Sequence, residues 1–387
     1  MLRLLTLLLI IPINTYATPF PIHTNAAGIP IIEIQKILEE SQSYIIYEED
    51  YGILVNKDDF IVFPINNTEV HKYIDLIKKE NLLFRKNPFN HQPDKFEAVM
   101  SHLYHLLIAP IKTSLQQSVH IIPSSSLSSI PWNALKNESN LYMVDQHAIS
   151  IQKTINHSLQ LPKRKVKTMV FAPQFTGSTY LNSKAEKETI TKLFRETKND
   201  MSHYDIIHIS SHGKIDSSNW LDSGIFINNE HILRNRDIMS MCINAQLVFL
   251  NICNGGETNQ KGKSIATAFQ EAGAQTVVAA LWEVEDQSAI KISKHFYEEI
   301  AQGEKPSEAL QTALLTYRNE VELTSELNPF YWAGFQVYGE NAAIIEELTY
   351  NMKRIISLVL SFLTSFSLLG YYYGGKIKGK LIEFNLV

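Results

Sequence analysis

Cysteine is almost absent from this chain, which has only Cys242 and Cys253 among its 387 residues. Small exported proteins without a large core depend on several disulfides, and two cysteines exclude a scaffold of that kind. The two thiols could still pair with each other, which would inactivate Cys253 as a nucleophile. Because Cys242 precedes an apolar run, we expect it to be an inert, packed thiol.

An excess of basic residues is missing as well. The chain has 35 Lys and Arg against 40 Asp and Glu, a net charge of -5. No basic stripe is available to neutralise phosphates, so we exclude a nucleic-acid partner. Internal repeats and low-complexity stretches are also absent. The 45% of hydrophobic residues are enough for one large or two modest domains.

The N-terminus has the pattern of a targeting segment. Arg3 precedes the apolar run 4–13, and residues 15–17 are of the kind that a signal peptidase reads. The run is shorter than the roughly 20 residues that a membrane helix needs. We therefore expect residues 1–17 to be a cleaved secretory signal peptide. An apolar first strand or a retained anchor is the alternative.

Charge is missing from residues 355–373, near the other end of the chain. The length of this run suits a membrane helix. Basic residues flank it on both sides, and the tyrosines at 371–373 suit a membrane interface. We expect a transmembrane helix at 355–373, with the body exported and the basic tail 374–387 left in the cytoplasm. An amphipathic or buried C-terminal helix is the alternative.

Apolar runs alternate with helical patterns from Val119 onward. This alternation predicts an α/β fold with a mostly parallel sheet covered by helices on both faces. Before it, we expect a short helix at 31–41, an antiparallel meander up to Pro64, and helices at 70–80 and 96–116. The later strands are expected at 119–122, 141–151, 167–172, 205–210, 246–253, 276–282 and 334–338. The later helices are expected at 183–196, 233–241, 264–272, 287–302 and 306–319.

Two of these expected strands end at reactive side chains. One is followed by His212 and Gly213, and the other ends at Cys253. Parallel strands carry their chemistry at their carboxyl ends, where a neutral imidazole can take the proton of a thiol. The backbone N–H groups of Gly213 and Cys253 can donate to a developing oxyanion. Taken alone, the spacing favours a structural histidine and cysteine over a catalytic pair.

A zinc site and a phosphate-binding loop are two other interpretations of these segments. A zinc site built from His208, His212, Cys242 and Cys253 lacks the close spacing of known zinc motifs. We therefore expect no metal and no cofactor. Residues 256–264 end in Gly-Lys-Ser like a phosphate-binding loop. That loop has four residues between its glycines, and this segment has five. Nucleotide binding is accordingly a minor alternative, and a polar, mobile loop beside the site is the expectation.

The same segments resemble a known family. His208-Ile-Ser-Ser-His212-Gly213 and Leu250-Asn-Ile-Cys253-Asn-Gly-Gly256 are similar to the His-Gly and Cys-Gly motifs of CHAT-domain peptidases, which are relatives of caspases, separases and gingipains. The resemblance continues in order from about residue 42 to 340. Its other blocks are Val119-His-Ile-Ile-Pro, Ile130-Pro-Trp-Asn-Ala-Leu135, Ala268-Phe-Gln-Glu-Ala-Gly-Ala-Gln-Thr-Val-Val278, Ala280-Leu-Trp-Glu-Val-Glu-Asp286, Phe296-Tyr297 and Asn328-Pro-Phe-Tyr-Trp-Ala-Gly-Phe335.

The resemblance implies a caspase-like fold with two lobes. The first lobe, 42–160, would be inactive, and the second, 161–340, would use His212 as base and Cys253 as nucleophile. Residues 18–41 would form a short helical lead and 341–354 a linker. One departure concerns the nucleophile: the family usually has Cys-Glu-Thr-Gly, whereas Asn254, Gly255 and Gly256 follow Cys253 here. This difference leaves substrate preference and rate open.

Three acidic residues are candidates for a substrate pocket that favours a basic side chain before the cut: Asp222, Glu283 and Asp286. Each position is more typical of an ordinary loop or helix-start charge, and Asp286 would cap the following helix. We expect an exported, membrane-anchored cysteine endopeptidase that acts on proteins and is restrained until a partner protein or a cut rearranges the loop 254–263. The alternative is a catalytically silent scaffold that binds partner proteins at the membrane.

Overall fold

The computed structural model describes residues 30–88, 91–155, 165–175, 183–194, 203–216, 218–259 and 262–345. The expected signal peptide, membrane helix and basic tail lie outside these described residues. Within the described part of the chain, no helix is both long enough and apolar enough to cross a membrane.

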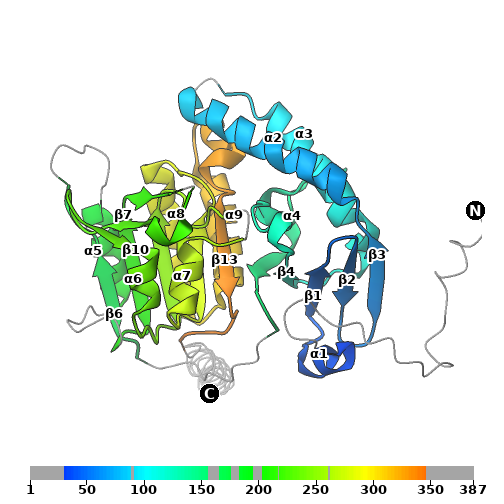
Figure 1. Cartoon of the computed structure of the whole chain (residues 1–387), viewed down its shortest axis with the longest axis horizontal. Coiled ribbons are helices and arrows are strands. Elements are labelled where there is room, and N and C mark those ends of the chain that lie inside the picture. The colour runs from blue at the N-terminus through cyan, green and yellow to red at the C-terminus, as the bar shows by residue number, and fades with distance from the viewer. Residues whose placement is uncertain are drawn as a thin grey trace, which may run out of the picture.

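One ten-stranded sheet runs through the whole molecule (Figure 1), in the order β3-β2-β1-β4-β5-β13-β12-β11-β7-β6. Neighbours pair in parallel except β1–β2, β2–β3 and β12–β13, so the expected mostly parallel α/β sheet is confirmed. The strands are β1 Gln42–Tyr47, β2 Tyr51–Val55, β3 Phe60–Pro64, β4 Ser118–Ile122, β5 Ala148–Ile151, β6 Thr168–Phe171, β7 Ile206–Ser211, β11 Leu247–Ile252, β12 Thr276–Ala280 and β13 Phe335–Gly339. A small sheet, β10-β9-β8, is formed by β8 Gly213–Lys214, β9 Gly224–Phe226 and β10 Ile232–Arg234.

Helices cover this sheet, and side-chain caps and a glycine mark several of their ends. The side chains of Asn66, Ser264 and Glu285 accept backbone N–H groups at the starts of α2, α7 and α8. Gly303 ends α8 with φ 97°. The helices are α1 Ile31–Ile37, α2 Asn67–Lys86, α3 Asp94–Leu107, α4 Met143–Gln146, α5 Ser183–Leu193, α6 Asn235–Met239, α7 Ile265–Glu271, α8 Asp286–Gln302 and α9 Pro306–Glu320.

The two expected lobes share their sheet and their core. Strand β5 of the first half pairs with β13 of the second, with Val337 opposite Ser150. Helices α2 and α3 run across the top of the molecule in Figure 1, and Phe84 and Phe96 from these helices pack on Phe330, with ring centroids 4.9 and 4.5 Å apart. The first half is thereby held against the segment that precedes β13 in the second half.

The helix expected at 70–80 is longer, Asn67–Lys86, that expected at 31–41 ends at Ile37, and three further elements differ for reasons that the structure shows. The extended run 141–151 is divided, because the backbone N–H of Tyr142 donates to Asp145 and starts α4 before β5 begins. The helix expected at 96–116 ends at Leu107, since Pro110 cannot continue it. The helix expected at 233–241 starts only at Asn235, after the short strand β10.

Candidate active site at the ends of two neighbouring strands

The structure brings His212, Gly213 and Cys253 together. Strands β7 and β11 are parallel neighbours whose last paired residues are Ser211 and Ile252. His212 and Cys253 are the next residue on each strand. The backbones also touch, because a Cβ atom on Gly213 would overlap the carbonyl oxygen of Cys253. Only glycine allows this approach, so the glycine after the histidine is required by the packing of the two strand ends.

Alternation along the strands places the two reactive side chains on one face. Phe249 is paired with His208, and their rings stack with centroids 5.3 Å apart. Two residues further, Asn251 is paired with Ser210. Because side chains alternate along a strand, the next pair on this face is Cys253 and His212.

The thiol of Cys253 lies in surroundings that oppose ionisation. Burial raises its pKa to about 12, and the negative charges of Glu283 and Asp286 add to this shift, while Arg85 opposes it. Desolvation and nearby like charge both disfavour a thiolate. The resting thiol is therefore protonated at neutral pH.

The imidazole of His212 is half-buried and held mainly by packing. Its ring lies against Phe175, with centroids 4.7 Å apart, and its backbone carbonyl accepts the N–H of Phe226 at 2.9 Å. Within the described residues the ring makes no hydrogen bond of its own. Among these residues, neither ring nitrogen is committed to another partner, which suits a proton transfer with the neighbouring thiol.

The described first part of the loop after the nucleophile is anchored by backbone hydrogen bonds. Asn254 has φ 58°, a conformation that asparagine tolerates better than most residues. The N–H of Gly256 donates to the carbonyl of Ala280 at 2.8 Å, and that of Ala266 donates to Gly255 at 3.0 Å. The Asn-Gly-Gly departure from the family motif thus has a local structural reason.

Two of the three acidic candidates lie near Cys253. Glu283 forms an ion pair of 2.7 Å with Arg85, which reaches the site from the end of α2. Oδ2 of Asp286 is buried without a hydrogen-bond partner, and burial together with Glu285, Glu186 and Glu283 raises the pKa of Asp286 to about 6. The expected capping role of Asp286 belongs to Glu285, whose carboxylate accepts the N–H of Ser288 at 2.8 Å.

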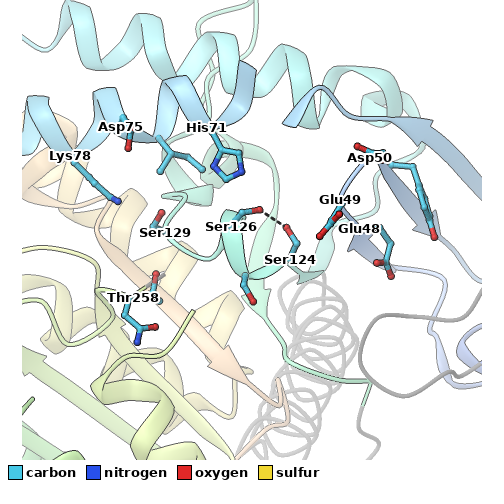
Figure 2. Close-up of a pocket in the computed structure, with 14 residues that line it drawn as sticks. Glu48, Glu49, Asp50, His71, Asp75, Lys78, Ser124, Ser126, Ser129 and Thr258 are labelled. Carbon is cyan, nitrogen blue, oxygen red and sulfur yellow. Dashed lines mark hydrogen bonds between the residues drawn. The ribbon is translucent and has the colours of Figure 1, made fainter. Parts of the chain in front are cut away.

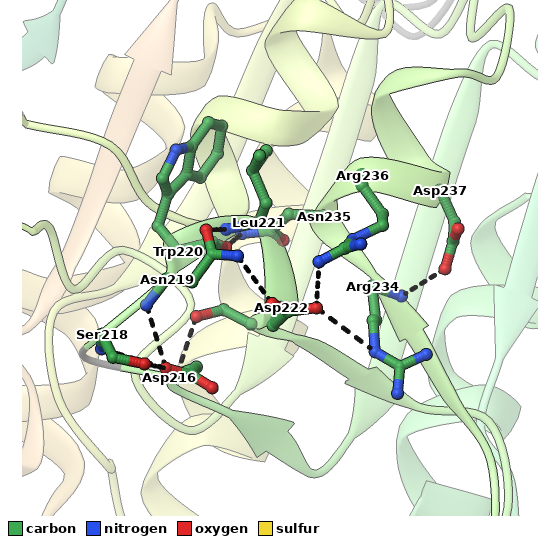
Figure 3. Close-up of polar contacts among 11 residues, drawn as sticks. Asp216, Ser218, Asn219, Trp220, Leu221, Asp222, Arg234, Asn235, Arg236 and Asp237 are labelled. Carbon is green, nitrogen blue, oxygen red and sulfur yellow. Dashed lines mark hydrogen bonds and ion pairs between the residues drawn. The ribbon is translucent and has the colours of Figure 1, made fainter.

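The third candidate, Asp222, is engaged elsewhere (Figure 3). Its carboxylate forms ion pairs with Arg234, at 3.7 Å, and Arg236, and accepts the side-chain amide of Asn219 at 2.6 Å. It is not among the charges that shift the pKa of Cys253. The structure therefore does not join Asp222 to the other two candidates.

The structure also shows the surroundings of Cys242, of Lys263 and of the candidate metal ligands. Cys242 is exposed, so the expectation of a packed thiol is wrong: the apolar strand begins five residues after it, at Leu247. Both cysteines are free. Lys263, of the Gly-Lys-Ser segment, is ion-paired with Glu271. Among the described residues no group of three or more His, Cys, Asp or Glu is arranged to hold a metal ion.

Sequence reasoning missed two features beside the strand ends. One is Glu186, a buried carboxylate under β7 and β11. The other is a cavity of about 770 Å³ at the junction of the two halves (Figure 2), lined by the β1–β2 turn, α2, the 124–129 loop and Thr258 and Asn259 of the nucleophile loop. Neither feature has a motif, because each is assembled from segments far apart in the chain.

Comparisons with known proteins give a match to one family model and similarities to several solved structures. Residues 159–340 match the family model described as the CHAT domain. No curated protein matches the chain. Among solved structures, separase of Saccharomyces cerevisiae in its complex with securin is similar at 16% identity and a TM-score of 0.40, covering 62% of this chain and 17% of separase.

Two gingipain structures are similar as well. The Arg-specific cysteine proteinase gingipain R matches at 8% identity and a TM-score of 0.44, covering 73% of this chain and 76% of its own. RgpB of Porphyromonas gingivalis, with its pro-domain, matches at 7% identity and a TM-score of 0.41, covering 73% and 78%. At these identities the similarity concerns the fold alone. By this match, residues 159–340 of the chain are similar to the CHAT domain.

Proposed function

We propose that this protein is a cysteine endopeptidase that cuts protein substrates with Cys253 and His212. The observation that carries the proposal is the adjacency of the two strand ends: Cys253 and His212 directly follow paired residues, and Gly213 touches the backbone of Cys253. A thiol and an imidazole on one face of neighbouring strands are the minimum that acyl transfer needs.

The reaction follows from these groups. Sγ of Cys253 attacks the scissile carbonyl carbon while His212 takes the thiol proton, and the N–H groups of Gly213 and Cys253 stabilise the oxyanion. The C–N bond then breaks as His212 returns the proton to the leaving amine, which leaves a thioester on Cys253. Water, deprotonated by His212, attacks the thioester and releases the acid and the free thiol.

Activity is restrained in the resting protein. A thiol with a pKa of about 12 is almost entirely protonated at neutral pH. A cation brought close to Glu283 and Asp286 would offset the charges that raise this pKa. The substrate side chain before the cut is accordingly basic, and a basic substrate promotes the thiolate that attacks it.

A peptide-library cleavage profile tests the activity, with Cys253→Ala as the control. We expect cuts after Lys or Arg, lost in Cys253→Ala and in His212→Ala. A peptidyl acyloxymethyl ketone with an arginine next to its reactive carbon should label Cys253 and leave the exposed Cys242 unmodified. Simple alkylating reagents are less informative, because the resting thiol is protonated.

The second candidate function is the catalytically silent scaffold that binds partner proteins at the membrane. The strongly raised pKa of Cys253 is the observation that favours it. A scaffold predicts no cleavage of any library peptide and equal, slow labelling of Cys253 in the wild type and in His212→Ala. Cleavage that depends on both residues would eliminate it.

Export and membrane attachment form a separate part of the proposal. They are supported by the apolar run at 4–13 and the uncharged run at 355–373. We expect the full chain to be recovered with membranes and to lose residues 1–17 on export. Recovery of a chain lacking 355–373 in the membrane fraction would contradict the anchor.

A further inference from the structure

A single buried carboxylate lies beneath the two strand ends. Glu186, on α5, is 2% exposed, and the buried His208 faces it from β7. Burial raises the pKa of Glu186, but the charge of His208 and the hydrogen bonds around the carboxylate outweigh burial and leave the pKa below its ordinary value. Glu186 is thus an ionised group inside the protein, which is costly unless its partners are well placed.

The partners of Glu186 come from both strands. On β11, Nδ2 of Asn251 donates to both carboxylate oxygens, at 3.0 and 3.1 Å. On β7, Nε2 of His208 lies 3.2 Å from Oε1, and its other ring nitrogen lies 3.2 Å from the hydroxyl of Tyr297. From α8, the hydroxyl of Ser293 donates to Oε1 at 2.8 Å. One carboxylate therefore joins β7, β11 and α8.

These contacts lie next to the reactive pair. Asn251 is two residues before Cys253 and on the same face, and His208 is on the same face as His212, four residues before it. The pairing of β7 and β11 ends at Ser211 and Ile252. Beyond this point no backbone ladder holds the two strand ends at a fixed separation, so side-chain contacts just below it control how Cys253 faces His212.

We propose that Glu186 is a positioning residue for the Cys253–His212 pair, holding β7 and β11 together through His208 and Asn251 directly below the reactive side chains. This inference rests on the proposed peptidase function. It assigns the carboxylate a role in the chemical step, where a small displacement of a nucleophile from its base is costly. Substrate binding depends on Glu283 and Asp286, neither of which contacts Glu186, although the charge of Glu186 contributes to the raised pKa of Asp286.

The chain offers a matched control. Glu308, on α9, is another largely buried carboxylate whose pKa is lowered despite burial. Its partners are the hydroxyls of Ser118, at 2.6 Å, and Ser307, at 2.8 Å, and the amide of Asn341, at 2.9 Å. None of these lies on β7 or β11. Glu308→Gln therefore removes a comparable buried charge without touching the strands that carry the site.

The test compares Glu186→Gln, Asn251→Ala and Glu308→Gln by thermal unfolding and by steady-state kinetics on the best-cleaved library peptide. We expect Glu186→Gln and Asn251→Ala to lower kcat on the order of 10- to 100-fold while KM changes less than about threefold. Glu308→Gln should lower the unfolding temperature to a similar extent but keep kcat within about twofold. The double variant with Glu186→Gln and Asn251→Asp, which exchanges the amide and the carboxylate, should regain part of kcat.

The outcomes separate the inference from the function on which it rests. If the wild type neither cleaves peptides nor is labelled at Cys253, the peptidase function fails, and the positioning role fails with it. If the wild type is active and the kcat of Asn251→Ala equals that of Glu308→Gln, the positioning role alone is overturned. Asn251→Ala leaves the carboxylate and its other partners in place, so it decides the question even if Glu186→Gln does not fold.

Discussion

Each half of the sheet buries one histidine on a central strand, and the two are surrounded differently. In the first half, His120 on β4 contacts neutral groups: the hydroxyl of Ser150 at 2.7 Å and the ring of Tyr44 at 4.9 Å. Burial lowers the pKa of His120 to about 4. In the second half, His208 on β7 faces the carboxylate of Glu186. The buried histidine of the first half hydrogen-bonds to neutral side chains, whereas that of the second half faces a carboxylate under the strand ends.

The residues that follow the central strands also differ between the two halves. In the first half β4 is followed by Pro123 and Ser124, and the serines there line the cavity in Figure 2, where Ser124 and Ser126 are joined at 2.9 Å. In the second half the corresponding positions are His212 and Cys253. The two halves share a sheet and a core, so their difference lies in the side chains at the strand ends rather than in the fold.

The largest expected effect follows from this difference. Cys253→Ala removes the nucleophile and should lower peptidase activity by at least about 1000-fold, whereas Ser124→Ala, at the end of β4, should keep it. Initial rates on the best-cleaved peptide measure both. Equal activity of the two variants would show that the chemistry is not at the end of β11.

A second expected effect contrasts one glycine from each half. A Cβ on Gly213 would overlap the backbone of Cys253, and one on Gly52 would overlap the ring of Phe63. Both Gly213→Ala and Gly52→Ala should therefore cost stability, by about 1–3 kcal/mol. Only Gly213→Ala should also lower kcat, on the order of 100-fold, because it separates the two reactive strand ends.

Thermal unfolding and kcat, measured on both glycine variants, test this prediction. Loss of kcat in Gly52→Ala to the same degree would mean that general destabilisation explains the effect. The comparison would then no longer distinguish the halves.

The pair of strand ends could be predicted from the sequence because each strand is a continuous apolar run with a reactive residue directly after it. His212 and Cys253 are therefore local features, and the ordered resemblance to CHAT domains supplies their pairing. The strand boundaries around them, β7 and β11, agree with the expectation to within one residue at each end.

The environment of the pair could not be predicted in the same way. Arg85 is 168 positions before Cys253 in the chain, and it reaches Glu283 only because α2 crosses from one half to the other. Asp222 looked similar to Glu283 in sequence, but arginines in the following segment compensate its charge. Such differences depend on tertiary contacts that no local pattern records.

A third prediction concerns His120 and pH. Its pKa is about 4 in the folded protein, against about 6.5 when unfolded. As the pH falls below 6.5, the unfolded state therefore binds a proton that the folded state does not bind. This histidine should lower the free energy of unfolding by about 2 kcal/mol between pH 7.5 and pH 5. His120→Gln should remove this contribution to the decrease in the free energy of unfolding.

Denaturant unfolding at the two pH values measures this effect. His231→Gln, at an exposed site, is the control and should behave as the wild type does. An unchanged pH dependence in His120→Gln would contradict the assignment of His120 as a buried histidine that stays neutral in the folded protein.

The smallest expected effect tests whether α2 of the first half tunes the thiol of the second. In a Cys242→Ala background, Arg85→Ala should raise the pKa of Cys253 and slow its reaction with iodoacetamide, because Arg85 is the cation that lowers this pKa. Glu283→Gln should lower the pKa and speed the reaction. Since Arg85 and Glu283 are each 46% exposed, solvent screens them, and we expect changes of only about two- to fivefold.

Arg234→Ala, which removes a cation paired with Asp222, is the matched control. A rate for Arg85→Ala equal to that of Arg234→Ala at low salt would mean that the halves share a sheet without sharing electrostatic control of the thiol.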